Sequence, residues 1–193
     1  MTAAATTPNF AQVRAAITGY VKMAPLGTAV PTDVTTAWAA GWIDLGAIDD
    51  KGVADSNKLS FTAVAAWQSA VAIRQLLKTQ APSMKFNALQ MNWATIQAWT
   101  GGAVSSLVSA GLYKVSMPPS VLATEMMLGI EYHDGTLTYR KWFNRGIFTD
   151  AADITYEKGT PIMPGLTYTA MPIDPSSTDL STFLTNDPAF ASS

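Results

Sequence analysis

The sequence contains no cysteine and only one histidine among its 193 residues. The absence of cysteine excludes disulfides, thiol nucleophiles and thiolate metal sites, and a lone histidine excludes any site that needs two imidazoles. Charged residues are also scarce, at 13% of the chain, which is about half the usual quarter. This charge density predicts a surface that is poorly hydrated or largely covered by other subunits.

The balance of charge is close to neutral, with 12 basic and 14 acidic residues and a net charge of −2. Strong nucleic-acid binding is not expected, because it needs many contacts between phosphates and Lys or Arg.

The first residues lack the positive and apolar regions of a signal peptide, so we expect synthesis in the cytoplasm. The uncharged stretch over 86–113 is interrupted by Asn, Gln and Gly, and we predict no membrane span.

Period-two alternation of apolar and polar residues dominates the chain and predicts strands with one apolar face. It recurs over 58–67, 84–88 and 166–170. The apolar positions in these segments are Leu59, Phe61, Ala63, Ala65, Trp67, Met84, Phe86, Ala88, Leu166, Tyr168 and Ala170. The sequence therefore predicts a mainly β protein.

The clearest local signal is the dipeptide Asp134-Gly135, which suits a two-residue type I′ turn because both positions tolerate positive φ. We expect His133 to pair with Thr136 across it. The register then puts the apolar residues of both strands on a core-facing side and leaves the opposite side hydrated. The core-facing side holds Met126, Leu128, Ile130, Tyr132, Leu137, Tyr139, Lys141 and Phe143, and the hydrated side holds Glu125, Glu131, His133, Thr136, Thr138 and Arg140.

Helical signals are few. Asn92 can cap a short helix over 93–99 that ends at the following Gly-Gly pair. Ser176 and Asp179 have the spacing of a capping box, and the apolar residues behind them predict a second short helix over 180–184.

The chain shows no internal repeat and no break in composition, which predicts a single domain over residues 1–193. We expect residues 1–16 to form an amino-terminal arm and residues 174–193 a carboxyl-terminal tail. The segment from Pro25 to Trp38 is rich in small polar residues, Gly and Pro, and predicts a long loop.

No catalytic or metal-binding motif is recognisable. Asp134 cannot orient His133, because adjacent residues of a strand point to opposite faces. Glu125 and Glu131 lie six residues apart on a strand, roughly 20 Å, which is too far for a pair acting on one bond. The aspartates at 49, 50 and 55 lack the spacing of a calcium loop, and no Gly-rich phosphate loop is present. We therefore predict no catalytic residue, no metal and no cofactor.

Charge is unevenly distributed along the chain. Five aspartates and a single lysine lie over 33–55, whereas 56–124 contains five basic residues and no acid. The two regions could be neighbours within one subunit, could attract each other between subunits, or could simply be solvated loops of uneven composition. The basic residues are Lys58, Arg74, Lys78, Lys85 and Lys114.

Tryptophan is abundant, with six residues at positions 38, 42, 67, 93, 99 and 142. We expect core packing for those at 67, 93, 99 and 142. Exposed tryptophans could instead stack on sugars, so a monomeric β-sandwich carbohydrate-binding module is the main alternative function.

Seven segments along the chain form a pattern through their order and spacing, although none of them is a chemical signature. They are 24–36, 42–46, 49–53, 67–69, 73–74, 84–91 and 186–190, the last reading Asn-Asp-Pro-Ala-Phe. In this order they resemble major tail tube proteins of long-tailed bacteriophages of actinobacteria, and the likeness covers most of the chain.

The resemblance implies a phage tail-tube β-sandwich or barrel with one short flanking α-helix and long loops. It also implies a non-enzymatic virion protein whose hexameric rings stack into a tube that conducts double-stranded DNA during ejection. Implied partners are further copies of the chain, the tape measure protein, the tail terminator and the baseplate or tail tip proteins. Such a subunit would be assembled in the host cytoplasm and reside in the virion tail.

A compact chain of this length has a radius of gyration of roughly 16 Å, and six such subunits in a ring leave a hole about one subunit wide, enough for duplex DNA. A wall of carboxylates and hydroxyls would let DNA slide, whereas a basic wall would hold it. We expect the hydrated face of the hairpin to line the channel, although the same face could equally meet solvent or a partner subunit. The lumen candidates are Glu125, Glu131, Thr136, Thr138 and Arg140.

Contacts between subunits or rings are expected from the long loop, from the tail and from the segments of opposite charge, because long loops commonly carry binding functions. The candidates are Pro25, Pro31, Asp33, Trp38, Asp49, Asp50, Arg74, Lys78, Asp179 and Phe190.

Overall fold

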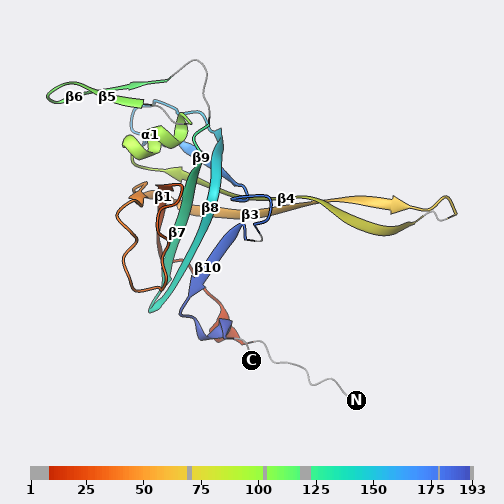
Figure 1. Cartoon of the computed structure of the whole chain (residues 1–193). Helices are drawn as coiled ribbons and strands as arrows, with labels where there is room; N and C mark the ends of the chain where they lie inside the picture. Colours follow the sequence, from red (N-terminus) through yellow and green to blue (C-terminus); the bar gives the residue numbers. More distant parts are fainter. Residues whose placement is uncertain (1–8, 69–70, 102–103, 118–122, 178, 192–193) are drawn as a thin grey trace.

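The computed structural model describes residues 9–68, 71–101, 104–117, 123–177 and 179–191 (Figure 1). The fold is mainly β with a single α-helix, which confirms the predicted class. The elements are η1 (Phe10–Gln12), β1 (Thr18–Pro25), β2 (Ile43–Asp44), β3 (Ile48–Ala65), β4 (Ala72–Ala88), α1 (Trp93–Trp99), β5 (Val104–Ser109), β6 (Leu112–Ser116), β7 (Met126–Asp134), β8 (Leu137–Ala151), β9 (Gly165–Ala170), β10 (Ser181–Thr185) and η2 (Pro188–Phe190).

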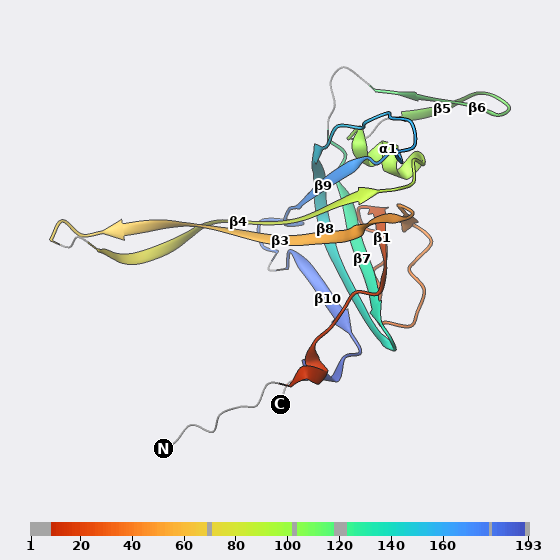
Figure 2. The same ribbon diagram turned by 180° about the vertical axis from the view of Figure 1, so that it is seen from behind.

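Eight strands form one antiparallel sheet in the order β2-β1-β7-β8-β9-β4-β3, with β10 paired to the first half of β8. The long strand β8 belongs to two layers, because its first half pairs with β7 and its second half with β9. The β9-β4-β3 layer crosses the β1-β7-β8 layer at a steep angle in both views (Figures 1 and 2). The sheet therefore folds over on itself as a sandwich.

The core lies between these two layers. Leu128 and Phe143 from one layer pack in the same buried cluster as Phe86 and Tyr168 from the other. The alternation over 84–88 and 166–170 is confirmed, since every second side chain in both segments is buried. Glycine is required at position 146, where a Cβ would lie 2.4 Å from the Tyr168 ring, so the strands can approach closely where β8 passes between layers.

The hairpin of β7 and β8 forms with a register two residues away from the expected one. His133 pairs with Thr138, and the two-residue loop is Gly135-Thr136. Of these two, only Gly135 has positive φ, at 62°, which fits a type II′ turn and corrects the expected type I′ turn. A shift of two residues preserves the side on which each side chain lies, so the core-facing set is unchanged.

The opposite face of this hairpin is covered, which corrects the expectation of a hydrated side. The loop between β1 and β2 folds back over it, and Trp38 and Trp42 pack there against Met127 and Trp142. Gly129 makes room for this loop, because a Cβ on it would lie 2.6 Å from the Trp38 ring. Residues 126–129 are consequently buried on both sides of the strand.

The first predicted helix is confirmed and the second is wrong. Asn92 caps α1 through a capping box with Thr95. Residues 181–185 form strand β10 on the edge of β8 instead of a helix. The hydrogen bonds offered by the bare edge of β8 outweigh the weak helical spacing of a segment this short.

Strands β3 and β4 leave the body together as a two-stranded hairpin (Figures 1 and 2). We call its part over Lys58–Ala81 the arm. The strand predicted over 58–67 is confirmed over 58–65, but no second layer of the described chain packs on its apolar face, and Phe61 is 52% exposed. Trp67 follows the strand and is fully exposed, and Trp93 at the start of α1 is also exposed. Both correct the expectation of core packing, which is confirmed for Trp99 and Trp142.

Candidate assembly surfaces

The arm presents two different faces, set by its register. Leu59, Phe61 and Ala63 lie on one face together with Leu77, because paired residues of antiparallel strands share a side. This apolar face has no layer packed on it, and Leu77 is 54% exposed.

The opposite face of the arm is mixed. Lys58 and Val64 lie there with Arg74 and Leu76 from β4. All four side chains are exposed, and neither cation forms an ion pair with a described residue. Lys78 is the extra residue at the irregularity between Ser60 and Phe61 and is likewise exposed. We call Lys58, Val64, Arg74 and Leu76 the cationic face of the arm.

The accessible surface area of the chain is larger than that of a compact monomer of the same mass. The chain has an accessible surface of 12771 Å² at a mass of 20.5 kDa. A compact monomer of that mass exposes about 9000 Å². Large exposed hydrophobic side chains are numerous on the arm, among them Leu59, Phe61 and Leu77, and surface of this kind is typical of protein that is buried by partners.

A second surface lies where the folded sheet fails to close. The start of β1 and the start of β3 flank an open groove of about 930 Å³. Its lining includes the apolar side chains of Val21, Val53, Met84 and Ile130, which we call its floor, and the carboxylates of Asp49, Asp50 and Asp55, which we call its rim. The cations Arg14 and Lys141 also line it, and they pair with Asp187 and Asp55. We call it the seam groove.

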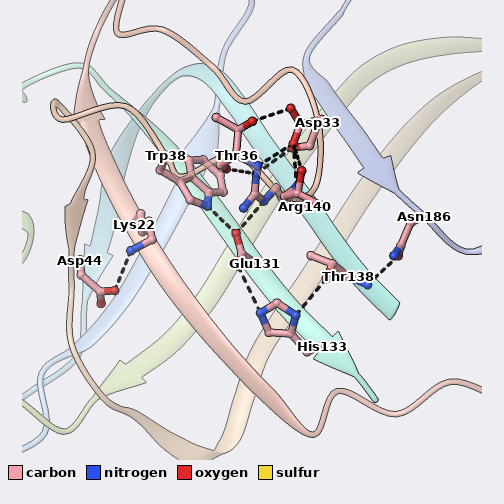
Figure 3. Close-up of polar contacts among 11 residues, drawn as sticks. Lys22, Asp33, Thr36, Trp38, Asp44, Glu131, His133, Thr138, Arg140 and Asn186 are labelled. Atoms are coloured by element: carbon pink, nitrogen blue, oxygen red, sulfur yellow. Dashed lines mark hydrogen bonds and ion pairs between the residues drawn. The ribbon is translucent and has the colours of Figure 1, made fainter. Parts of the chain in front are cut away.

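Three lumen candidates form one network beneath the long loop (Figure 3). The Arg140 Nε donates to Glu131 Oε2 at 2.6 Å, and the guanidinium also donates to the carbonyls of Asp33 and Thr36 at 2.7 Å. Arg140 is only 4% exposed and therefore anchors the loop rather than meeting bulk water. Glu131 also accepts from the Trp38 indole at 2.5 Å.

The single histidine belongs to the same network. His133 Nε2 lies 3.1 Å from Glu131 Oε1, and its Nδ1 lies 3.1 Å from the Thr138 hydroxyl (Figure 3). Asp134 does not orient the ring, as expected, and instead accepts a hydrogen bond from the Ala15 backbone. The histidine is therefore held in a bridge between strand residues.

The loop is also fixed from within. Asp33 accepts hydrogen bonds from the backbone N–H and hydroxyl groups of Thr35 and Thr36. These donors hold the pKa of Asp33 well below its ordinary value, because they stabilise the carboxylate. Pro31 is buried, and Trp38 packs against a buried cluster of its own subunit. Pro25, in contrast, is exposed at the end of β1.

The remaining lumen candidates lie apart from this network. Glu125 pairs with Arg145 at 2.6 Å, and hydrogen bonds from the guanidinium lower the pKa of Glu125. Thr136 is exposed at the tip of the hairpin. The Thr138 backbone N–H donates to the Asn186 side chain (Figure 3). The structure thus brings together Glu131, Thr138 and Arg140 but not Glu125.

Both ends of the described chain meet at a clasp that the sequence did not predict. Arg14 pairs with Asp187 at 2.5 Å, and the buried Tyr139 hydroxyl donates to the same carboxylate at 2.6 Å. Hydrogen bonds from Arg14 and Tyr139 lower the pKa of Asp187. Phe190 lies beside Tyr139 and remains exposed. The only sequence signal was Asp187 before Pro188, a helix-start pattern.

The other inter-subunit candidates are spread over the surface. Asp50 and Asp179 are exposed, and Asp49 is half-buried with one oxygen accepting from the Asn87 amide at 2.8 Å. Arg74 and Lys78 lie on the arm, far along β4 from the body.

The described residues contain no cluster of three or more side chains that could hold a metal ion. Within the same ranges, no helix is long and apolar enough to cross a membrane. The carbohydrate-binding alternative gains no support from the comparisons below. Trp38, Trp42 and Trp142 pack against one another, whereas Trp67 and Trp93 are exposed at separate places, on the arm and at the start of α1.

Comparison with known proteins gives one assignment. The family described as phage tail tube protein matches residues 6–193, and no curated protein matches the chain significantly. The match spans nearly the whole sequence and agrees with the mainly β sandwich and its single short helix. The chain therefore belongs to the phage tail tube protein family, a family of structural components of the virion tail.

Proposed function

We propose that this chain is the repeating subunit of the tail tube of a long-tailed phage, forming hexameric rings that stack around a channel for double-stranded DNA. The observation that carries the proposal is the arm, whose apolar face over Leu59, Phe61 and Leu77 has no second layer packed on it from the part of the chain that the structure describes. Burying such a surface against further copies is favourable, whereas leaving it in water is costly.

Unpaired sheet edges support closure into a ring. The outer edge of β3 has no strand partner among the described residues, and β1 is paired with β2 only at Lys22 and Met23. Bare edges invite pairing with another chain, and a closed ring satisfies them without leaving a free end.

Passive conduction of DNA requires a wall that does not bind phosphate. We propose that the hairpin of β7 and β8 faces the channel. Glu131 and Arg140 neutralise each other beneath the loop, so the exposed tip at Thr136 and the half-buried Glu125 and Thr138 are the members of the predicted set available to a wall. A tube reconstruction with Thr136 on the outer surface would overturn this assignment.

The long loop, the tail and the charged segments remain proposed contacts between rings. The tail is partly structured, since β10 joins the sheet and Asp187 is buried. A tube of this kind needs a protein that sets its length and proteins that close both ends, so we propose the tape measure, terminator and tail tip proteins as partners.

The direct test is electron microscopy of the purified full-length chain at increasing concentration. We expect rings and then tubes with an open axis. The matched variant replaces residues 59–80 with Asn-Gly, which joins the paired residues Lys58 and Ala81 by a short turn. It should keep the cooperative unfolding of the body and stay monomeric. Monomers only from the full chain at any concentration would overturn the proposal.

A further inference from the structure

The seam groove combines features of an unfilled binding site. Its walls are two sheet edges, β1 near Thr18–Tyr20 and β3 near Ile48–Asp55. Each strand is paired on its inner side, β1 with β7 and β3 with β4, and its outer side has no strand partner along these residues within the described chain. Its floor is made of core side chains such as Val53 and Ile130. A segment placed there would add backbone hydrogen bonds and cover apolar surface at once.

The acidic rim of the groove is only partly neutralised within the described chain. Asp55 is paired with Lys141 at 2.5 Å, but Asp50 is exposed and forms no ion pair with a described residue. One carboxylate oxygen of Asp49, Oδ1, is buried and accepts no hydrogen bond in the described structure. A buried acceptor without a donor is costly, so Asp49 is not fully satisfied within the described subunit. The exposed Asp50 is the rim carboxylate that a second molecule can reach.

The arm carries the complementary chemistry. On its cationic face Arg74 lies opposite Val64 and next to Leu76, and Lys58 lies on the same face six residues before Val64. This face therefore offers a cation beside apolar groups, as the rim and floor of the groove do in the opposite sign. No acid lies over 56–124 to neutralise these cations locally.

The arm cannot serve the groove of its own subunit. Arg74 pairs with Val64, which is nine residues beyond Asp55 on the same strand, or about 30 Å. Both views show the arm leading away from the body (Figures 1 and 2). At this separation the charges are screened from each other in physiological salt.

We propose that the cationic face of the arm docks into the seam groove of a second copy, with Arg74 at the Asp49-Asp50 rim and Val64 and Leu76 on the apolar floor. The inference rests on the proposed tube function and names the receiving surface for the arm. A contact that joins two different surfaces is heterologous and propagates from copy to copy, as a ring or a stack of rings requires.

Charge exchange tests the pairing without disturbing the core. We expect Arg74→Asp, and separately Asp50→Arg, to raise the concentration needed for assembly about tenfold or more, as loss of a close interfacial charge pair does. The double variant should recover most of the loss. Lys114→Asp, which changes an exposed cation on β6, is the matched control and should assemble normally.

Crosslinking gives a second readout, because the natural chain has no cysteine. A variant carrying Asp50→Cys and Arg74→Cys should form a ladder of disulfide-linked oligomers under mild oxidation, whereas Asp50→Cys with Lys114→Cys should not. Tubes that form without a ladder and without rescue by charge exchange would overturn this docking while the tube function stands. If the natural chain never assembles, both proposals fail.

Discussion

Strands β3 and β4 carry two segments with the same alternation of apolar and polar residues and opposite fates. In the body, Met84, Phe86 and Ala88 of β4 are at most 2% exposed, whereas in the arm Leu59 of β3 is 49% and Phe61 is 52% exposed. The body segment packs in one buried cluster with residues of β1, β7, β8 and α1, and the arm segment has only β4 beside it among the described residues. Alternation therefore specifies that one face is to be buried but not by which molecule.

The comparison divides the chain by role. The body holds a core that two layers of the same chain share, so its stability is a property of the single subunit. The arm is a two-stranded hairpin with no second layer, and such a hairpin is marginal alone. Mutations in the body should therefore change folding, and mutations in the arm should change assembly.

The largest effect on the free energy of unfolding should come from a change in the body, Phe143→Ala. The side chain is fully buried in the core, and its loss should cost about 3–5 kcal/mol of unfolding free energy, because the cavity collapses only partly. Urea unfolding of the two proteins measures the difference. A cost below about 1 kcal/mol would mean that the two layers are not packed as described.

The clasp at the chain ends should make stability depend on acid pH. The pKa of Asp187 is lowered in the folded state, so its stabilisation is complete above the unfolded value of about 4 and is lost as the pH falls below it. We expect the natural chain to lose stability between about pH 5 and pH 2 more steeply than Asp187→Asn, which should be the less stable protein at pH 7.

Urea midpoints across this pH range give the measurement. Asp150→Asn changes an exposed aspartate of β8 and is the control, which should follow the natural chain. Parallel pH curves for Asp187→Asn and the natural chain would contradict the role of the clasp.

Gly129→Ala should weaken the packing of the long loop on the outer face of the β7-β8 hairpin and so lower the free energy of unfolding. The new Cβ would meet the Trp38 ring at 2.6 Å, and relieving this overlap should cost about 1–3 kcal/mol. Measured in a Trp38→Ala background, the same change should cost clearly less, because the ring is gone. Equal costs in both backgrounds would show that the loop does not rest on this glycine.

The smallest effect on folding is expected in the arm. Phe61→Ala should change the unfolding free energy by no more than about 0.5 kcal/mol, since its side chain is 52% exposed. Sedimentation of the same protein should nevertheless show weaker assembly, because the apolar face is smaller. Normal tubes from this variant, or a destabilised body, would remove the distinction between arm and body.

Local signals in the sequence predicted much of the fold because they act over a few residues. The capping pattern at Asn92 predicted α1, and period-two alternation predicted β4 and β9. The hairpin of β7 and β8 was predicted with a register two residues off, because Asp134-Gly135 and Gly135-Thr136 both suit tight turns.

Contacts between distant residues could not be predicted in this way. The bond from Arg140 to the Asp33 carbonyl spans 107 residues, and the clasp from Arg14 to Asp187 spans 173. The lumen candidates are predicted from the strand face alone. They therefore include Arg140 and Glu131, although the long loop covers both side chains. No local pattern states which segment folds back over a strand.

By itself the sequence determined the β class, the position of the one α-helix and the lack of a recognisable catalytic motif, because composition and short-range spacing are sufficient for these. Only the tertiary structure decided that residues 181–185 pair with β8 as a strand and that the long loop covers the outer face of the β7-β8 hairpin. It also decided that the arm projects from the body with its apolar face uncovered. The physical reason is that burial depends on which surfaces meet across the whole chain, and local spacing records only that a surface is apolar.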